Sequence, residues 1–185
     1  MRARDYAYFD GPTPTGLAHR GGAAYHPNLG IENTIAAFRQ AVDMGYRYLE
    51  TDVHATRDGI VVAFHDDHLD RVTDTAGRIA DQPYAAVRGA LIGGREAVPT
   101  LAELLEEFPE TRVNIDIKAD QALGPTLELI RRMGVIDRVC IGSFSERRLR
   151  AARRALGPRL ATSAGRSAWA RFALRHSHFR GCSTP

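Results

Sequence analysis

The stretch that decides the fold covers residues 48–65 and reads YLETDVHATRDGIVVAFH. Its β-branched and aromatic residues predict two strands, over 48–56 and 60–65. The Asp58-Gly59 dipeptide between them is a turn signal, so the two strands are expected to be joined by a tight connection. Upstream, residues 17–21 are expected to form a brief strand that ends in glycines.

Downstream of this pair, short β-branched runs alternate with helical patterns. Thr100 and Glu103 have the spacing of a capping box, which predicts that a helix begins at Leu101. Strand–helix units joined by short loops indicate an α/β domain with a parallel sheet. The segment 66–99 lacks periodicity and is interpreted as an irregular insertion with short helical turns. The expected helices cover 32–44, 101–108, 123–133, 146–156 and 168–175, and the later strands cover 112–118, 138–143 and 159–163.

The composition of the 185 residues, 44% hydrophobic and 25% charged, suits one globular domain and is too polar for a membrane-embedded protein. The longest apolar run, 60–64, is far shorter than the roughly 20 residues that span a bilayer. The N-terminal stretch MRARDYAYFDGPTPTG builds no apolar signal segment, so a cytoplasmic location is expected. Cys140 and Cys182 are too few for a disulfide scaffold or a four-ligand zinc site.

Charge is distributed unevenly along the chain. Residues 1–120 carry 12 basic and 19 acidic side chains, whereas residues 121–185 carry 13 basic and 3 acidic ones. An acidic first part suits metal binding, and a basic second part could face phosphate, nucleic acid or an anionic membrane surface. A solvated arginine-rich helix face is the structural alternative for the basic part.

Polar clusters stand at or just after the ends of several predicted strands. Because parallel strands send their carboxyl ends to one face, these groups are expected to converge in space. Each cluster alone has an ordinary structural explanation, but their succession along neighbouring strands indicates a functional site. The clusters are His19-Arg20, Glu50-Thr51-Asp52, His65-Asp66 and Asp116-Ile117-Lys118.

Glu50 and Asp52 are two residues apart in a strand and therefore point to the same face. Two carboxylates on one side of a buried strand repel each other unless a cation or a basic group lies between them. Asp116 and Lys118 repeat the spacing on a later strand. Carboxylate oxygens without companion cysteines favour a hard ion, Mg²⁺ or Ca²⁺, over zinc.

The ordered set of motifs resembles the glycerophosphodiester phosphodiesterase family over residues 17–165. The matching residues are His19-Arg20-Gly21, Ile31-Glu32-Asn33-Thr34, Glu50-Thr51-Asp52-Val53, Thr56-Arg57-Asp58-Gly59, His65-Asp66, Arg71-Val72-Thr73, Pro99-Thr100-Leu101 and Ser143-Phe144. Two positions depart from the family pattern. Ile31 precedes Glu32 where proline is common, and Asp116 takes the place of a glutamate, which keeps the carboxylate but shortens its reach.

The resemblance implies a TIM (β/α)8 barrel with a small insertion, which fits segment 66–99. Such barrels usually take about 250 residues, and only about six of the eight strands can be counted here. We therefore expect a single catalytic domain over 1–185 whose barrel is truncated at its C-terminal end. Residues 1–15 would form an N-terminal lead-in and 176–185 a loose tail.

The resemblance also implies the roles of the site residues. A divalent cation would be held by Glu50, Asp52 and Asp116, with Glu32 close to it. His19 and His65 would be the acid–base pair, while Arg20 and Lys118 would contact the substrate phosphate. An unperturbed histidine titrates near about 6.5, so at neutral pH one histidine of a pair can act as a base and the other as an acid.

The expected reaction is hydrolysis of a glycerophosphodiester to sn-glycerol 3-phosphate and an alcohol. The attacking group is left open between water and the neighbouring glycerol 2-hydroxyl. One alternative is a lysophospholipase D, and a second is a truncated barrel that only binds metal or phosphate. Nucleic acid is not expected as a partner, because no basic groove interleaved with aromatic residues is present. Membrane-surface contact, the oligomeric state and the choice between Mg²⁺ and Ca²⁺ stay open.

Overall fold

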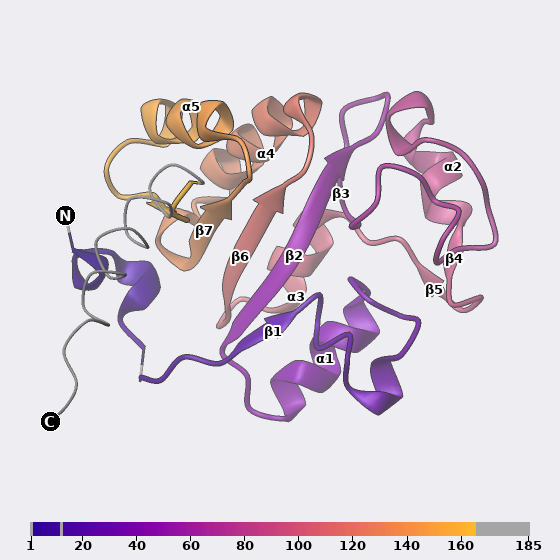
Figure 1. Ribbon diagram of the computed structural model, residues 1–185, viewed down its shortest axis with the longest axis horizontal. Coiled ribbons are helices and arrows are strands. Elements are labelled where there is room, and N and C mark those ends of the chain that lie inside the picture. Colours follow the sequence, from indigo (N-terminus) through magenta and orange to yellow (C-terminus); the bar gives the residue numbers. More distant parts are fainter. Residues whose placement is uncertain (1, 12, 166–185) are drawn as a thin grey trace, which may run out of the picture.

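A six-stranded sheet forms the centre of the molecule in a computed structural model that describes residues 2–11 and 13–165. Five strands run parallel in the order β1-β2-β6-β7-β8, and the sheet is open at its edges among the described residues (Figure 1). The strands are β1 (Leu17–His19), β2 (Tyr48–Ala55), β3 (Val61–Ala63), β6 (Arg112–Ile117), β7 (Val139–Gly142) and β8 (Ala161–Thr162).

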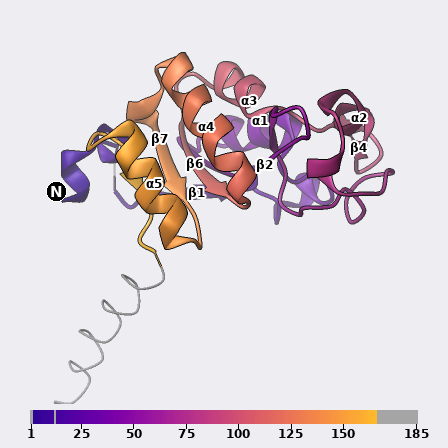
Figure 2. The ribbon, with the colours of Figure 1, turned by 90° about the horizontal axis from the view of Figure 1, so that it is seen from above.

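The helices α1, α3, α4 and α5 pack on one face of this sheet and bury its apolar side chains. Leu49, Ile115 and Ile141, from three neighbouring strands, are fully buried in this core. Figure 2 shows α4 and α5 lying side by side along the sheet. The bounds are α1 (Ile35–Asp43), α3 (Leu101–Glu107), α4 (Asp120–Met133) and α5 (Glu146–Leu156), and short 3-10 turns lie at η3 (His26–Asn28) and η5 (Ile136–Arg138).

Side-chain caps explain where these helices begin. Thr34, Thr100 and Ser145 each accept a hydrogen bond from a backbone N–H in the first turn of the helix that follows. Glu103 completes the predicted capping box by bonding back to the N–H of Thr100. The start of α3 is therefore confirmed, whereas α4 begins at Asp120, three residues before its expected start.

The second strand of the hairpin, β3, runs antiparallel to β2, with Ala63 opposite Val53. The predicted tight connection is confirmed, but β3 is not one of the parallel strands of the sheet. The insertion follows it and contains η4 (Ile79–Asp81), α2 (Tyr84–Gly89), β4 (Leu91–Ile92) and β5 (Glu96–Ala97). It encloses a small apolar core of its own, formed by Val62, Phe64, Leu69, Ile79, Val87, Ala90, Ile92 and Val98.

The N-terminal lead-in packs against the amino ends of the strands. It forms two 3-10 turns, η1 (Ala3–Asp5) and η2 (Ala7–Phe9). Tyr8 is buried with Tyr48 and Cys140, and the Tyr48 hydroxyl donates a hydrogen bond to the Tyr8 carbonyl. This contact closes the end of the sheet that lies opposite the site described below.

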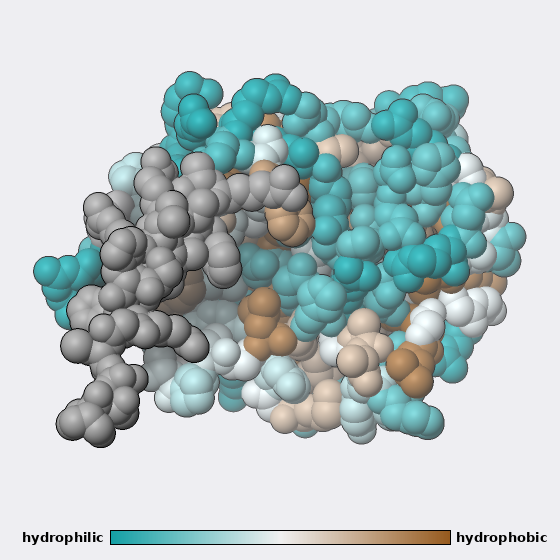
Figure 3. All heavy atoms as spheres, in the orientation of Figure 1, coloured by the Kyte–Doolittle hydropathy of each residue, from teal (hydrophilic) through white to brown (hydrophobic). Residues whose placement is uncertain are grey.

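Most of the expected architecture is confirmed. The six strands are present, and the sheet has the parallel α/β arrangement that the sequence predicts. The expected helix over 168–175 and the tail over 176–185 lie outside the described residues. Among the described helices, none combines the length and the apolar character needed to cross a membrane. On the face of the molecule drawn in Figure 3, most described residues are hydrophilic and apolar ones are scattered among them.

The core of the central strand provides a test of the fold. Ile115→Ala should lower the free energy of unfolding by about 2–5 kcal/mol, because it leaves a cavity at a fully buried position of β6. Ile60→Ala, at an exposed position beside the hairpin turn, is the control and should change it by less than about 1 kcal/mol. Urea denaturation followed by circular dichroism measures both, and equal losses would contradict this packing.

Candidate active site

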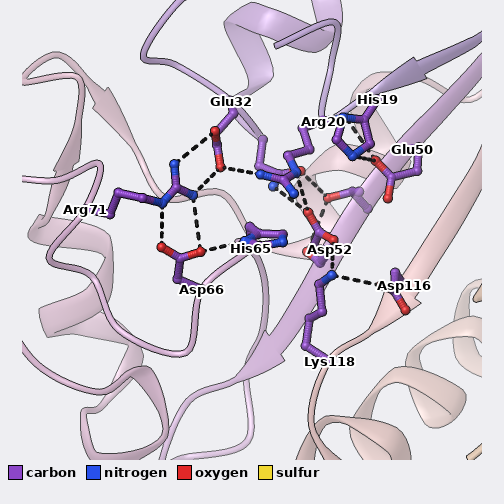
Figure 4. A network of polar contacts seen from close by, with 12 residues as sticks. His19, Arg20, Glu32, Glu50, Asp52, His65, Asp66, Arg71, Asp116 and Lys118 are labelled. Carbon is purple, nitrogen blue, oxygen red and sulfur yellow. Dashed lines mark hydrogen bonds and ion pairs between the residues drawn. The ribbon is translucent and has the colours of Figure 1, made fainter. Parts of the chain in front are cut away.

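The eight site residues predicted from the sequence lie together at the carboxyl edge of the sheet (Figure 4). Glu50 and Asp52 come from β2, and Asp52 is directly opposite Asp116 of β6 in the strand register. His19 ends β1, opposite Glu50. The remaining members, Arg20, Glu32, His65 and Lys118, come from the loops that follow the strands at this edge.

Asp52 is the most buried carboxylate of the site, with 1% of its surface exposed; two cations compensate its charge, and an amide donates a hydrogen bond to it. Lys118 Nζ lies 2.8 Å from Asp52 Oδ1, and Arg20 Nε forms an ion pair with Asp52 Oδ2 at 3.2 Å. Asn33 Nδ2 donates a hydrogen bond to Oδ2 at 3.2 Å. Asp52 thus connects the loops that follow β1 and β6.

Lys118 bridges two carboxylates, because its Nζ also lies 2.9 Å from Asp116 Oδ2. Burial alone would lower the pKa of Lys118, but its hydrogen bonds to Asp52 and Asp116 outweigh burial and raise it. The lysine therefore stays charged at neutral pH and supplies positive charge between β2 and β6.

Glu50 is less well compensated by positive charge than Asp52. Burial raises its pKa to about 7, and the nearby charges of Asp52 and Asp116 act in the same direction. The backbone N–H of Arg20 donates to Glu50 Oε2 at 3.0 Å, and Nε2 of His19 lies 3.9 Å from the same oxygen. A buried carboxylate of this kind is stabilised by an added cation.

The loop after β1 needs a sharp turn to bring Arg20 over these carboxylates. Arg20 has a φ of 49° and Gly21 a φ of 76°, both in the left-handed region. A Cβ on Gly21 would lie 3.0 Å from the backbone nitrogen of Phe38 in α1. Glycine thus follows the His-Arg pair because the turn passes too close to α1 for a side chain.

Two arginines hold Glu32 in place. Arg20 Nη1 donates to Glu32 Oε1 at 3.1 Å, and Arg71 Nη2 donates to the same oxygen at 2.6 Å. Burial on its own raises the pKa of Glu32, but the hydrogen bonds and charges of Arg71 and Arg20 outweigh it and lower the pKa. The carboxylate is therefore ionised and lies between two guanidinium groups.

His65 reaches the site by a different route from the other residues. It follows the antiparallel strand β3, which returns the chain to the level of Asp52, where Phe64 N donates to the Asp52 carbonyl at 2.9 Å. Asp66 Oδ1 lies 2.5 Å from His65 Nδ1, so the opposite ring nitrogen, Nε2, is left for the site. His54, buried on β2, lies with its Nε2 3.1 Å from the His65 carbonyl.

The oxygen donors at this edge fit a hard divalent cation in their chemistry. Glu50, Asp52 and Asp116 are carboxylates from two neighbouring strands, and their mutual repulsion is relieved by positive charge. Within the described part of the chain, no three His, Cys, Asp or Glu side chains are grouped closely enough to hold a metal ion as they stand. In this arrangement Lys118 supplies the positive charge between Asp52 and Asp116.

Three residues of the site received no role from the sequence: Asn33, Asp66 and Arg71. Each belongs to a motif of the resemblance, but its contacts depend on how loops fold back. Asn33, at a φ of 59°, donates to Asp52 and accepts a hydrogen bond from the Thr51 hydroxyl at 2.9 Å. The left-handed preference of asparagine was the one local signal for its position.

Curated relatives match most of this chain. A probable glycerophosphodiester phosphodiesterase 2 of Mycobacterium tuberculosis is 45% identical over 152 residues, which cover 82% of this chain and 56% of the relative. The human lysophospholipase D GDPD1 is 36% identical over 131 residues, or 63% of this chain and 40% of the relative. The chain thus spans about half the length of these relatives.

Solved structures share the fold. A phosphodiesterase of Oleispira antarctica, determined in complex with the product sn-glycerol-3-phosphate, is 30% identical with a TM-score of 0.73 and covers 90% of this chain and 72% of that one. A glycerophosphoryl diester phosphodiesterase domain from M. tuberculosis is 20% identical with a TM-score of 0.76, over 90% and 65% of the two chains. The architecture is that of the TIM-barrel enzymes of this group, and the described residues contribute five of its parallel strands.

The match to the family model covers the site from its first residue. It extends over residues 19–166 and includes the strand ends, the insertion and the two loops that carry Arg20 and Lys118. On this match, and on the relatives above, the chain belongs to the glycerophosphoryl diester phosphodiesterase family.

Proposed function

We propose that the protein hydrolyses glycerophosphodiesters to sn-glycerol 3-phosphate and an alcohol, with the help of a divalent cation. The observation that carries this proposal is the convergence of His19 and His65 with three strand carboxylates and two cationic side chains at one edge of the sheet. The related enzyme of O. antarctica was determined with sn-glycerol-3-phosphate as its product.

Arg20 and Lys118 are the groups that would bind the phosphodiester. A phosphodiester carries one negative charge, which repels nucleophiles until positive charge offsets it. Arg20 is held by Glu32 and Asp52, and Lys118 by Asp52 and Asp116, so both cations are fixed before substrate arrives. Such preorganised charge also stabilises the additional negative charge of the transition state.

The two histidines would share the proton transfers. One accepts the proton of the attacking group, which is water or the glycerol 2-hydroxyl, and the other donates a proton to the leaving alkoxide. His65 is oriented by Asp66 on one side and by the backbone contact to His54 on the other. His19 is more accessible, with 66% of its side chain exposed.

Glu50, Asp52 and Asp116 would hold the cation, with Glu32 close to it. When bound, Mg²⁺ or Ca²⁺ supplies further positive charge to the phosphate oxygens. The site residues bind and orient the phosphodiester around that charge.

His19→Ala and His65→Ala should each lower kcat by at least about 10²-fold, because each removes one of the two proton-transferring groups. Calorimetric titration with Mg²⁺ or Ca²⁺ should show that both variants still bind the cation. His68→Ala is the control, since His68 is exposed and contacts Asp67 outside the site. Wild-type turnover of glycerophosphocholine by either His19→Ala or His65→Ala would contradict the assignment.

Removal of divalent cations should also abolish the activity of the enzyme. We expect dialysis against a chelator to abolish hydrolysis of glycerophosphocholine, and addition of Mg²⁺ or Ca²⁺ to restore it, because the strand carboxylates then regain their counter-charge. Glu50→Gln should raise the concentration of Mg²⁺ or Ca²⁺ that is needed to restore hydrolysis, because it weakens cation binding. Activity that is unchanged by the chelator would rule out the cation.

A lysophospholipase D activity is the second candidate. Phe144, at 69% the most exposed large apolar residue in the described part of the chain, follows β7 and lies beside Lys118, whose Nζ is 5.9 Å from the centre of its ring. An apolar side chain next to a phosphate-binding lysine could contact an acyl chain, and the human relative carries the name lysophospholipase D.

Substrate competition separates the two candidates. We expect a higher kcat/KM for glycerophosphocholine than for lysophosphatidylcholine. The substitution Phe144→Ala should have little effect on the kcat/KM for glycerophosphocholine. A higher value for lysophosphatidylcholine, lost selectively in Phe144→Ala, would favour the lysophospholipase. Absence of turnover with both, together with cation binding, would support a module that only binds metal or phosphate.

A further inference from the structure

Arg71, in the insertion, binds two carboxylates at once. Towards Glu32, its Nη2 and Nη1 lie 2.6 Å and 3.3 Å from the two carboxylate oxygens. Towards Asp66, its Nε and Nη2 lie 2.6 Å and 3.2 Å from the two oxygens. Each carboxylate is therefore bound through both of its oxygens, an arrangement that the fork of a guanidinium makes and an ammonium does not.

These contacts belong to a longer series in which basic and acidic side chains alternate. At one end, Glu32 accepts a hydrogen bond from Arg20, the expected phosphate-binding residue. At the other end, Asp66 contacts Nδ1 of His65 at 2.5 Å. We call Arg20–Glu32–Arg71–Asp66–His65 the charge chain; Figure 4 shows it as a continuous path of dashed lines.

We propose that Arg71 is a positioning residue that fixes the imidazole of His65 relative to Arg20 through the charge chain. The proposal rests on the proposed phosphodiesterase reaction, in which these two side chains act on the same phosphate. The hydrogen bonds of Arg71 go to Asp66 and Glu32, and through these two carboxylates it reaches His65 and Arg20.

The contacts of Arg71 explain why its loss would slow the proton-transfer step. Asp66 Oδ1 accepts from His65 Nδ1 only while the carboxylate keeps its position beside the ring, and Arg71 binds both of its oxygens. Without Arg71, Glu32 and Asp66 lose their shared cation and are free to turn towards other donors. Arg20 keeps its ion pair with Asp52, so phosphate binding should suffer less than proton transfer.

The experiment compares Arg71→Ala, Arg71→Lys and the control Arg88→Ala. Arg88 lies in the same insertion, has a similarly exposed side chain, 50% against 46% for Arg71, and forms a 2.6 Å ion pair with Glu103 away from the site. Steady-state hydrolysis of glycerophosphocholine gives kcat and KM, and thermal unfolding reports whether each variant is folded.

Arg71→Ala should lower kcat by on the order of 10²-fold, because it misplaces the group that transfers the proton. Its KM should change by less than about threefold, which is the signature of an effect on chemistry rather than on uniform binding. Arg71→Lys, which keeps the charge and can pair with one carboxylate, should fold normally and recover only part of kcat. Arg88→Ala should keep the wild-type kcat.

Nitrogen-15 NMR of the histidine side chains gives a readout that does not depend on turnover. In the wild type, the His65 Nδ1–H proton should be observed and protected from exchange, and in Arg71→Ala it should be lost. A wild-type kcat in Arg71→Ala, an unchanged His65 signal, or an equal loss of kcat in Arg88→Ala would each overturn the proposal. If the proposed function itself is wrong, the wild type will show no turnover of glycerophosphocholine. The NMR comparison would still test the charge chain in that case, so the two failures can be told apart.

Discussion

The carboxylate of Asp52 is the group on which the site depends. It lies on β2, which pairs with β1, β3 and β6, and is almost unexposed to water, so an unpaired charge there would cost several kcal/mol. The cations that offset it, Arg20 and Lys118, come from loops after the two strands that flank β2 in the sheet, and so does Asn33, which donates a hydrogen bond to it. Satisfying one buried charge therefore brings together Arg20 and Lys118, the two residues proposed to bind the phosphate.

The division of labour between sheet and loops follows from this requirement. The sheet holds the carboxylates, because the strand register places Asp52 opposite Asp116 and makes their separation a property of the backbone. The loops carry His65 and the two arginines, whose positions depend on side-chain pairing, and His19 is the last residue of β1. In the proposed reaction, the strand carboxylates would hold the cation, whereas the histidines, Arg20 and Lys118 would transfer protons and contact the phosphate.

The sequence predicted the parts of the site that depend on local rules. Period-two spacing correctly placed Glu50 and Asp52 on one face, and the Asp58-Gly59 dipeptide correctly placed the hairpin turn. It did not predict that Arg71 pairs with Glu32, 39 residues away, because that contact requires two loops to fold over one edge. The expectation that His65 ends a parallel strand was wrong, because a connection as short as the predicted hairpin turn can only join antiparallel neighbours.

The antiparallel return of β3 has a consequence for how this protein can change. The insertion leaves the barrel and rejoins it at neighbouring points, where Ala63 N donates to the Pro99 carbonyl at 2.9 Å and Val62 forms a bridge with Thr100. The excursion between them is a closed loop, whose closure entropy grows by only about 0.6 kcal/mol for each doubling in length. Evolution can therefore lengthen or shorten the part of this excursion that follows Arg71, while Asp66 and Arg71 stay at the site and the strands keep their register.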